Sequence, residues 1–311
     1  MSTYRIGVDL GGTNIAAGLV DENYCILKKK SIKTNLPRTA EAVCEDIAAL
    51  CRTLCDEANI AFDNIAHIGI GSPGIICRGV VNSAANLGFH NAPVADMVAK
   101  LTGKPVSLKN DGNAAALGEL VAGCGKGKSS LIAVTIGTGV GGGVILNNTI
   151  IEGFNGAAGE VGHIIIEAGG RPCGCGARGC FETYCSASAL IRDTKEAMIA
   201  HPESALHTLA PTLDDVNGKT AFDGMRLGDE TATAVVDHFI NMLAVGVSSL
   251  IQLLQPEIIC IGGGVAAEGD YLLLPLRKKV VAQTLAGADG MRTTIVCATL
   301  GNDAGIIGAA V

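Results

Sequence analysis

Residues 4–21 read YRIGVDLGGTNIAAGLVD, and residues 129–148 read SSLIAVTIGTGVGGGVILNN. Each stretch has an apolar run, a glycine-rich turn and a second apolar run, which is the pattern of a β-hairpin. Because the pattern recurs about one domain further along the chain, we interpret it as an internal duplication. Two domains would then each begin with a hairpin whose turn faces a common cleft.

The segments around these hairpins alternate between strand and helix patterns, which predicts an α/β fold. We expect a helix over residues 39–58, a buried strand at IAHIGIGSPG and a polar loop at SAANLGFHN (residues 83–91). A further helix is expected directly after Asn110-Asp111, a long apolar one over residues 231–254, and another after the strand EIICIGGG. The predicted domains are residues 1–110 with 300–311, and residues 111–299.

Composition and charge exclude several classes of protein. The chain of 311 residues has a net charge of −7, which argues against the basic surface that nucleic-acid binding requires. The sequence starts directly on an apolar strand, without a signal peptide. The best apolar run, Met242 to Leu254, is broken by Ser248, Ser249 and Gln252, so we expect no membrane span. The prediction is a cytoplasmic protein with no nucleic-acid or membrane partner.

The glycine turns are candidate phosphate-binding sites, because glycine leaves backbone N–H groups accessible to an anion. Neither hairpin turn matches a P-loop or a dinucleotide-binding fingerprint, and for any single turn the steric need for glycine is the favoured explanation. The set of three is more informative, and Asp9 at a strand end suits Mg²⁺ bound through water. The candidate residues are Asp9, Gly11, Gly12, Thr13 and Asn14, then Thr138 and Gly139, then Gly262, Gly263 and Gly264.

A cysteine cluster lies in HIIIEAGGRPCGCGARGCFETYCS, residues 163–186. Cys173, Cys175 and Cys180 can converge on one ion, and His163 could complete a tetrahedral zinc site, although C-x-C spacing is less typical than C-x₂-C. Four protein ligands leave no open position, so the zinc would be structural. Cys185 is expected to pack in a helix. The helical spacing of Cys44, Cys51 and Cys55 and the strand position of Cys260 indicate small core residues.

The motifs DLGGTN, IGTGVGGG and IGGGV resemble the fold of the sugar kinases, hexokinases and actin-like ATPases, which is ribonuclease H-like. More narrowly, the whole chain resembles the ROK family of sugar kinases and repressors. The specific signature is GEVGH at residues 159–163, followed by the cysteines and by Glu182. The resemblance implies two domains around a cleft, ATP with Mg²⁺, and the same set of three cysteines and one histidine around a structural zinc. In the family, this zinc loop positions the sugar-binding acids.

The resemblance also implies roles for individual residues. Asp111 aligns with the catalytic base, although the residues alone favour a helix cap, which would by itself explain an Asp at this position. A zinc-bound His163 would keep a second ring nitrogen for a sugar hydroxyl. The residues that align with sugar-hydroxyl contacts are Asn86, Asn110, Asp111, Glu160, His163 and Glu182.

The expected function is ATP-dependent phosphorylation of a hexose at its 6-hydroxyl, with glucose favoured and the family suggesting a homodimer or homotetramer. N-acetylmannosamine, N-acetylglucosamine, allose and fructose stay open as substrates, because kinases for these sugars share nearly all the residues. A sugar-responsive repressor is disfavoured, because its DNA-binding domain would precede the first hairpin, which here starts at residue 4. A non-catalytic sugar or zinc binder is disfavoured by the presence of Asp111.

Overall fold

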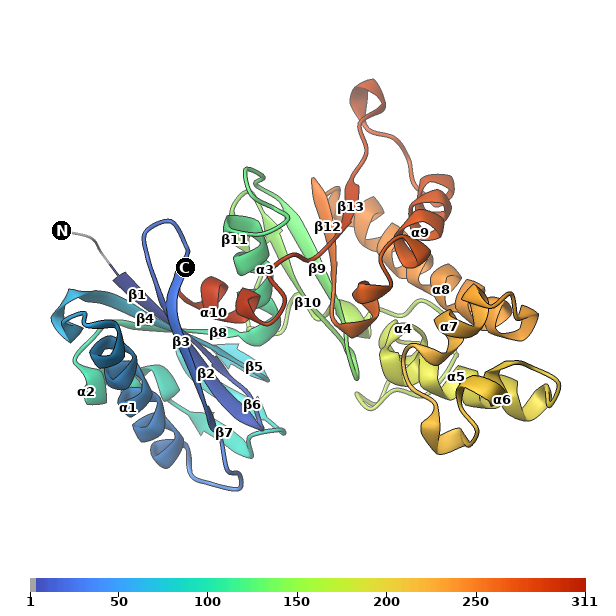
Figure 1. The fold of residues 1–311 in the computed structure, drawn as a ribbon. Helices are drawn as coiled ribbons and strands as arrows, with labels where there is room; N and C mark the ends of the chain where they lie inside the picture. The colour runs from blue at the N-terminus through green and yellow to red at the C-terminus, as the bar shows by residue number, and fades with distance from the viewer. Residues whose placement is uncertain (1–3) are drawn as a thin grey trace. The chain divides into compact units, whose positions relative to one another are not determined.

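The computed structural model describes residues 4–311, which form two compact units (Figure 1). Of the described residues, unit 1 comprises 4–133, 143–159 and 299–311, and unit 2 comprises 134–142 and 160–298. Residues 111–133 and 143–159, assigned to the second domain in the sequence analysis, therefore pack within unit 1. The domain boundaries themselves stay a prediction.

Unit 1 is built on a five-stranded sheet in the order β3-β2-β1-β4-β8. β1 (Tyr4–Leu10) and β2 (Asn14–Val20) form the predicted antiparallel hairpin, and β3 (Ile26–Lys33) extends it. β4 (Ile65–Ser72) and β8 (Val106–Asn110) add in parallel on the other side. β3 has strictly alternating exposure, and its three consecutive lysines obscure this pattern in the sequence.

The core of unit 1 lies between this sheet and two helices, α1 (Ala40–Ala58) and α2 (Val94–Thr102). α1 begins at the cap Thr39, whose side chain accepts a hydrogen bond from the N–H of Ala42, and ends at the left-handed residue Asn59. A short helical turn, η1 (Phe62–Asn64), follows. The predicted core cysteines are confirmed as buried: Cys44, Cys51 and Cys55 here, and Cys260 and Cys185 in unit 2.

Two further helices of unit 1, α3 (Asp111–Val121) and α10 (Asp303–Ala309), pack against each other. Figure 1 shows the C-terminal α10 beside α3. Their backbones are nearly in contact: a Cβ at Gly118 would lie 2.1 Å from the carbonyl oxygen of Ala304, and one at Gly308 would lie 1.7 Å from that of Ala114. Only glycine allows two helices to approach this closely.

The segment predicted as a polar loop at residues 83–91 forms parts of a small antiparallel sheet instead. β5 (Ile75–Cys77), β6 (Val80–Ala84) and β7 (Phe89–Ala92) pair in the order β5-β6-β7, and only residues 85–88 form a turn. The loop prediction was wrong because exposed polar residues hide the buried Ala84 and Phe89.

The second predicted hairpin is also present. β9 (Leu131–Ile136) and β10 (Val140–Leu146) are neighbours in a sheet ordered β11-β10-β9-β12-β13. The other strands are β11 (Thr149–Ile150), β12 (Ile258–Gly262) and β13 (Thr294–Cys297). The duplicated hairpins and the mixed sheets confirm the predicted fold class.

Unit 2 contains most of the remaining helices. They are η2 (Val161–His163), α4 (Glu182–Cys185), α5 (Ala187–Ala200), α6 (Leu206–Leu209), η3 (Leu213–Asp215), α7 (Thr220–Arg226), α8 (Glu230–Leu254), η4 (Gly264–Glu268), α9 (Asp270–Gln283) and η5 (Ala288–Gly290).

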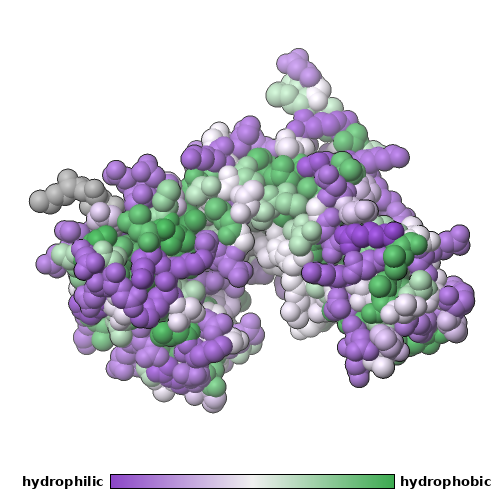
Figure 2. Space-filling model, viewed as in Figure 1, coloured by the Kyte–Doolittle hydropathy of each residue, from purple (hydrophilic) through white to green (hydrophobic). Residues whose placement is uncertain are grey.

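α8 has 25 residues, and its length and composition alone would allow it to cross a membrane. In the structure, however, 56% of its most apolar window is buried. Ser248, one of the residues expected to interrupt this segment, lies on the buried face. Figure 2 shows hydrophilic residues spread over the visible face of both units. A buried core helix accounts for this segment.

Candidate functional site

The first turn, residues 11–14, joins β1 to β2 and borders a pocket within unit 1. The N–H of Gly11 donates to the carbonyl of Asn14 at 2.9 Å, and the Thr34 hydroxyl donates to the carbonyl of Gly11 at 2.7 Å. Thr13 and Asn14 are exposed. The pocket has a volume of about 570 Å³, and it is lined by Asp9, Gly11, Gly12, Thr13, Asn14, Ala16, Lys29, Lys30, Ser31, Asn302, Asp303 and Ile306.

Sequence reasoning missed part of this lining. Lys29 and Ser31 lie two residues apart on the exposed face of β3. Asn302 directly precedes α10, and Asp303 is its first residue. The Lys29 ammonium lies 2.8 Å from the Asp303 carboxylate. The three consecutive lysines of β3 hide its alternation, so no clear pattern in the sequence indicated this part of the lining.

At the junction of β8 and α3, the structure shows whether Asn110 or Asp111 caps the helix, which the sequence did not decide. The Asn110 side-chain oxygen accepts hydrogen bonds from the N–H groups of Gly112 and Asn113, at 2.9 and 3.2 Å. Asn110 is therefore the helix cap. Asp111 accepts a backbone hydrogen bond from Gly112 at 2.8 Å, and the residue keeps an exposed surface although its carboxyl group is partly buried. Capping does not explain the aspartate.

Asp9 and Asp111 share an electrostatic environment at the ends of β1 and β8–α3. Burial, together with the negative charge of Asp111, raises the pKa of Asp9 to about 6. Burial also raises the pKa of Asp111, and the backbone N–H of Gly112 offsets part of that effect. Both groups hold a proton more tightly than ordinary carboxyls, and an adjacent cation would favour their ionised forms.

Asn86 is exposed in the turn between β6 and β7 and lies beside the first glycine turn. A Cβ at Gly12 would come within 3.1 Å of the carbonyl oxygen of Asn86. The turn between β6 and β7 therefore packs on the first hairpin. The structure thus brings Asn86 close to the candidate phosphate-binding residues of the same unit.

In unit 2, the second turn, residues 137–139, is held by Glu182. The Glu182 carboxylate accepts a hydrogen bond from the N–H of Val140 at 3.0 Å. A Cβ at Gly139 would lie 2.1 Å from the same oxygen, so glycine permits this contact. Gly162 packs equally closely, since a Cβ there would lie 2.0 Å from the carbonyl of Val140. The candidate phosphate turn and the GEVGH motif thus meet at the start of β10.

The four predicted metal ligands come together in unit 2. The ligand atoms of His163, Cys173, Cys175 and Cys180 all lie within 4.8 Å of one another. The His163 Nδ1 atom is 3.7 Å from the Cys173 Sγ atom, and the same distance separates the sulfurs of Cys175 and Cys180. The Glu182 carboxylate borders the cluster, with Oε1 at 3.9 Å from the Cys173 sulfur.

The thiols of this cluster differ in environment. The backbone N–H of Ala177 and the neighbouring Cys173 lower the pKa of the exposed Cys175, whereas burial raises the pKa of Cys180 to about 12. Cys175 therefore ionises before Cys180, and a bound cation would be needed to hold Cys180 as a thiolate.

The metal loop, residues 163–180, is fastened to the helices that follow it. The Tyr184 hydroxyl accepts a hydrogen bond from the N–H of Arg171 at 2.7 Å, and the Arg171 guanidinium lies 4.7 Å from the centre of the Tyr184 ring. The same guanidinium pairs with Asp193 of α5 at 3.0 Å. Beyond the loop, the buried ring of Phe181 packs on Gly246 of α8.

Glu160 precedes the short helical turn η2, His163 is its last residue, and both are exposed. The N–H of His163 donates to the carbonyl of Glu160 at 3.0 Å, while Val161 and Gly162 between them are buried. The turn therefore anchors its apolar centre and leaves both polar side chains accessible.

The third turn, Gly262–Gly264, ends β12 inside unit 2. Gly263 has a φ of 83°, and a Cβ there would lie 2.2 Å from the carbonyl of Ile136, so this glycine is required for packing. Gly262 is buried, with a Cβ position in ordinary contact with Ala298. A Cβ at Gly264, in contrast, would meet nothing within 4 Å. Gly263 and Gly264 are both exposed, and of the three glycines Gly264 is the one whose Cβ position meets open space.

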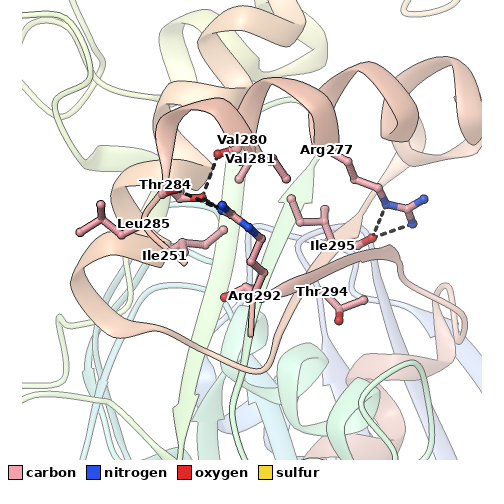
Figure 3. A pocket seen from close by; sticks show the side chains of 10 residues that line it. Ile251, Arg277, Val280, Val281, Thr284, Leu285, Arg292, Thr294 and Ile295 are labelled. Atoms are coloured by element: carbon pink, nitrogen blue, oxygen red, sulfur yellow. Dashed lines mark hydrogen bonds between the residues drawn. The ribbon is translucent and has the colours of Figure 1, made fainter. Parts of the chain in front are cut away.

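A separate pocket of about 200 Å³ lies among α8, α9 and β13, away from these residues (Figure 3). Its wall is mainly apolar, and the guanidinium groups of Arg277 and Arg292 donate to the backbone carbonyls of Ile295 and Thr284. Both arginines therefore hold the surrounding segments together, and none of the predicted site residues lines this pocket.

The chain matches the model of the ROK family over residues 5–311. It is 40% identical to a glucokinase of Thermotoga maritima over 98% of this chain and 95% of that protein. It is 33% identical to an N-acetylmannosamine kinase of Haemophilus influenzae, over 98% and 93% of the two chains. A similar solved structure is a ROK family glucokinase from Streptomyces griseus in complex with glucose and AMPPNP. That structure has a TM-score of 0.79 and 36% identity, and the match covers 99% of this chain and 98% of that one.

The raised pKa of Asp9 gives a testable pH dependence. Because the folded pKa is about 6 and the unfolded one about 3.9, ionisation of Asp9 opposes folding above about pH 6. We expect Asp9→Asn to raise the midpoint of thermal unfolding at pH 7.5. The gain should shrink as the pH falls from 6 towards 4, where wild-type Asp9 becomes protonated in both states. Thermal unfolding of wild type and Asp9→Asn between pH 4 and 7.5 checks this prediction. A gain in the unfolding midpoint that does not depend on pH would contradict the raised pKa of Asp9.

Proposed function

The chain belongs to the ROK family, and on this basis we propose that it is an ATP-dependent hexose kinase that phosphorylates the 6-hydroxyl of glucose. The observation that carries the proposal is at the start of α3: Asn110 caps the helix, so capping does not account for the aspartate at position 111. Full-length similarity to proteins named glucokinase, and to one solved with glucose and AMPPNP, supports the substrates.

Asp111 is the proposed catalytic base. Phosphoryl transfer to a hydroxyl needs an acceptor for the proton, a positioned nucleophile and charge stabilisation around the phosphates. The raised pKa of Asp111 makes it a stronger base than an ordinary aspartate. The proton would pass from the 6-hydroxyl to a carboxylate oxygen of Asp111 as the hydroxyl oxygen attacks the terminal phosphorus of ATP. The bond between that phosphorus and the bridging oxygen would break, and ADP would leave with the electron pair.

The nucleotide and its Mg²⁺ are assigned to the glycine turns. Asp9 would hold the water shell of Mg²⁺, which neutralises the phosphates. The first and second turns would present N–H and hydroxyl donors, and the accessible backbone at Gly264 would face the nucleoside. The residues proposed for ATP are Asp9, Gly11, Gly12, Thr13, Asn14, Thr138, Gly139, Gly262, Gly263 and Gly264.

The sugar is assigned to side-chain acceptors rather than to aromatic surfaces, which suits a polyhydroxylated ligand. Glu182 has a double role in this proposal, because one carboxylate oxygen already accepts the N–H of Val140 and the other faces the cysteine cluster. It would therefore couple the sugar site to the second turn. The proposed sugar contacts are Asn86, Asn110, Asp111, Glu160, His163 and Glu182.

The cysteine cluster fits a structural zinc. With Zn–S bonds of about 2.3 Å, the ligands of a tetrahedral ion lie about 3.7 Å apart. The distances between His163 and Cys173, and between Cys175 and Cys180, match this spacing. Because the His163 Nδ1 atom faces Cys173, Nε2 would be left for a sugar hydroxyl. The zinc would fix the fold of the metal loop and supply no reactive species.

Other features follow the family resemblance alone. We propose two domains, residues 1–110 with 300–311 and residues 111–299, in a cytoplasmic enzyme that assembles as a homodimer or homotetramer. A kinase for another sugar is the second candidate function, because similarity to an N-acetylmannosamine kinase also extends over nearly the whole chain.

Coupled ADP release with a panel of hexoses and N-acetylhexosamines tests the function and separates the two candidates. We expect glucose to give the highest kcat/KM, and Asp111→Asn to lower kcat by about 10²–10⁴-fold. Sugar affinity should change much less, because an amide oxygen still accepts a hydroxyl hydrogen bond.

Asp111→Asn should not destabilise the protein, because Asn110 supplies the cap. A kcat within a few-fold of wild type on the folded variant would contradict the catalytic role. A higher kcat/KM for an N-acetylhexosamine than for glucose would identify that sugar as the substrate in place of glucose.

Purified protein is expected to contain about one zinc ion per chain. Cys175→Ser should lower the zinc content and raise the KM for the hexose more than the KM for ATP, since Glu182 borders the cluster. Cys25→Ser, at an exposed cysteine of unit 1, is the matched control and should leave both values unchanged. Elemental analysis that finds no metal in active protein would refute the zinc site.

A further inference from the structure

The segment η4, which begins in the third glycine turn, ends at a buried acid, Glu268. Glu268 is the last residue of η4, which begins at Gly264, and its side chain is only 5% exposed. Its carboxylate pairs with the guanidinium of Arg226, at the end of α7. A buried carboxylate without a partner is strongly unfavourable, so this pairing decides where the end of η4 can lie.

Arg226 is itself held from two further directions. Its NH1 group donates to Asp223 of α7 at 2.7 Å, and its guanidinium lies 4.5 Å from the centre of the Tyr271 ring of α9. The hydrogen bond to Glu268 is the main cause that raises the pKa of Arg226, so the guanidinium remains charged. One side chain therefore connects α7, η4 and α9.

The segment from Gly263 to Glu268 is thus held at both ends, and its backbone is accessible at Gly264. At its start, Gly263 packs on the carbonyl of Ile136, and at its end Glu268 is held by Arg226. Between them, the Cys297 thiol donates to the carbonyl of Ala266 at 3.4 Å, while the backbone at Gly264 faces open space. The accessible part of the turn depends on these two anchors for its position.

We propose that Arg226 is a positioning residue for nucleotide binding, which acts through Glu268 on the turn at Gly262–Gly264. The inference rests on the proposed function, in which this turn contacts the nucleoside of ATP. Arg226 does not touch the nucleotide in this assignment. Its effect should therefore fall on the binding of ATP and not on the binding of the hexose.

The chain offers a matched control in Arg171. This arginine also stacks on a tyrosine and pairs with a largely buried acid, Asp193, and its side chain is 31% exposed compared with 30% for Arg226. It fastens the metal loop rather than the third turn. Loss of either arginine removes the same kind of interaction. Loss of Arg226 should affect the binding of ATP, whereas loss of Arg171 should affect the binding of the hexose.

The experiment measures AMPPNP and glucose binding by calorimetry, and both KM values, for wild type, Arg226→Gln and Arg171→Gln. We expect Arg226→Gln to weaken AMPPNP binding about tenfold, or about 1.4 kcal/mol, with glucose binding within twofold of wild type. Arg171→Gln should instead weaken the binding of glucose more than the binding of AMPPNP. Calorimetry needs no turnover, so failure of wild type to bind AMPPNP or glucose would refute the proposed function, separately from the role of Arg226.

Two more variants keep the test decisive if Arg226→Gln folds poorly. Arg226→Gln combined with Glu268→Gln removes the buried charge, and Arg226→Lys keeps the positive charge without the planar fork. Both should fold, and both should bind AMPPNP more weakly than wild type while binding glucose normally. Unchanged AMPPNP affinity in these variants, or an equal loss of both ligands, would overturn the inference.

Discussion

The backbone of α10 packs directly on the backbones of β1, β4 and α3, and the rest of unit 1 depends on that contact. A Cβ at Gly7 of β1 would lie 1.8 Å from the carbonyl of Ile306, and one at Gly69 of β4 would lie 1.7 Å from that of Ala309. On the other side, Gly118 and Gly308 allow the same approach between α10 and α3. The helix therefore sets the spacing between the sheet and α3, and with it the spacing between Asp9 and Asp111.

A buried acid secures the segment that enters this helix. The Glu119 carboxylate, 2% exposed, accepts hydrogen bonds from the N–H groups of Thr299 and Leu300, at 2.9 and 2.8 Å, and from Cys124. These bonds place residues 299–311 in unit 1, although the preceding strand β13 belongs to unit 2. Gly305 of α10 then lies against Asp9, with its Cβ position 3.4 Å from the carboxyl carbon. This packing also contributes to the burial that raises the pKa of Asp9.

Much of this arrangement could be predicted from local patterns. The two hairpins were recognisable because apolar alternation and glycine turns are local features, and the cysteine spacing indicated a cluster that the structure assembles with His163. The small sheet β5-β6-β7 was not recognised, because its polar strands lack an apolar period. The sequence also could not show that Asn110 and not Asp111 caps α3, since either residue type can cap a helix. The pairing of Arg226 with Glu268 joins positions 42 residues apart, and no local pattern indicates it.

The free energy of unfolding of Gly118→Ala, measured by urea denaturation, tests the central role of α10 most directly. In an ordinary helix, replacing glycine by alanine stabilises by about 1 kcal/mol. Here the added Cβ would lie 2.1 Å from the carbonyl of Ala304, so we expect a destabilisation of about 1–3 kcal/mol instead. Gly141→Ala is the control, because a Cβ there would meet nothing within 4 Å. An unchanged or increased free energy of unfolding for Gly118→Ala would contradict the account, since it would show that α10 does not constrain α3.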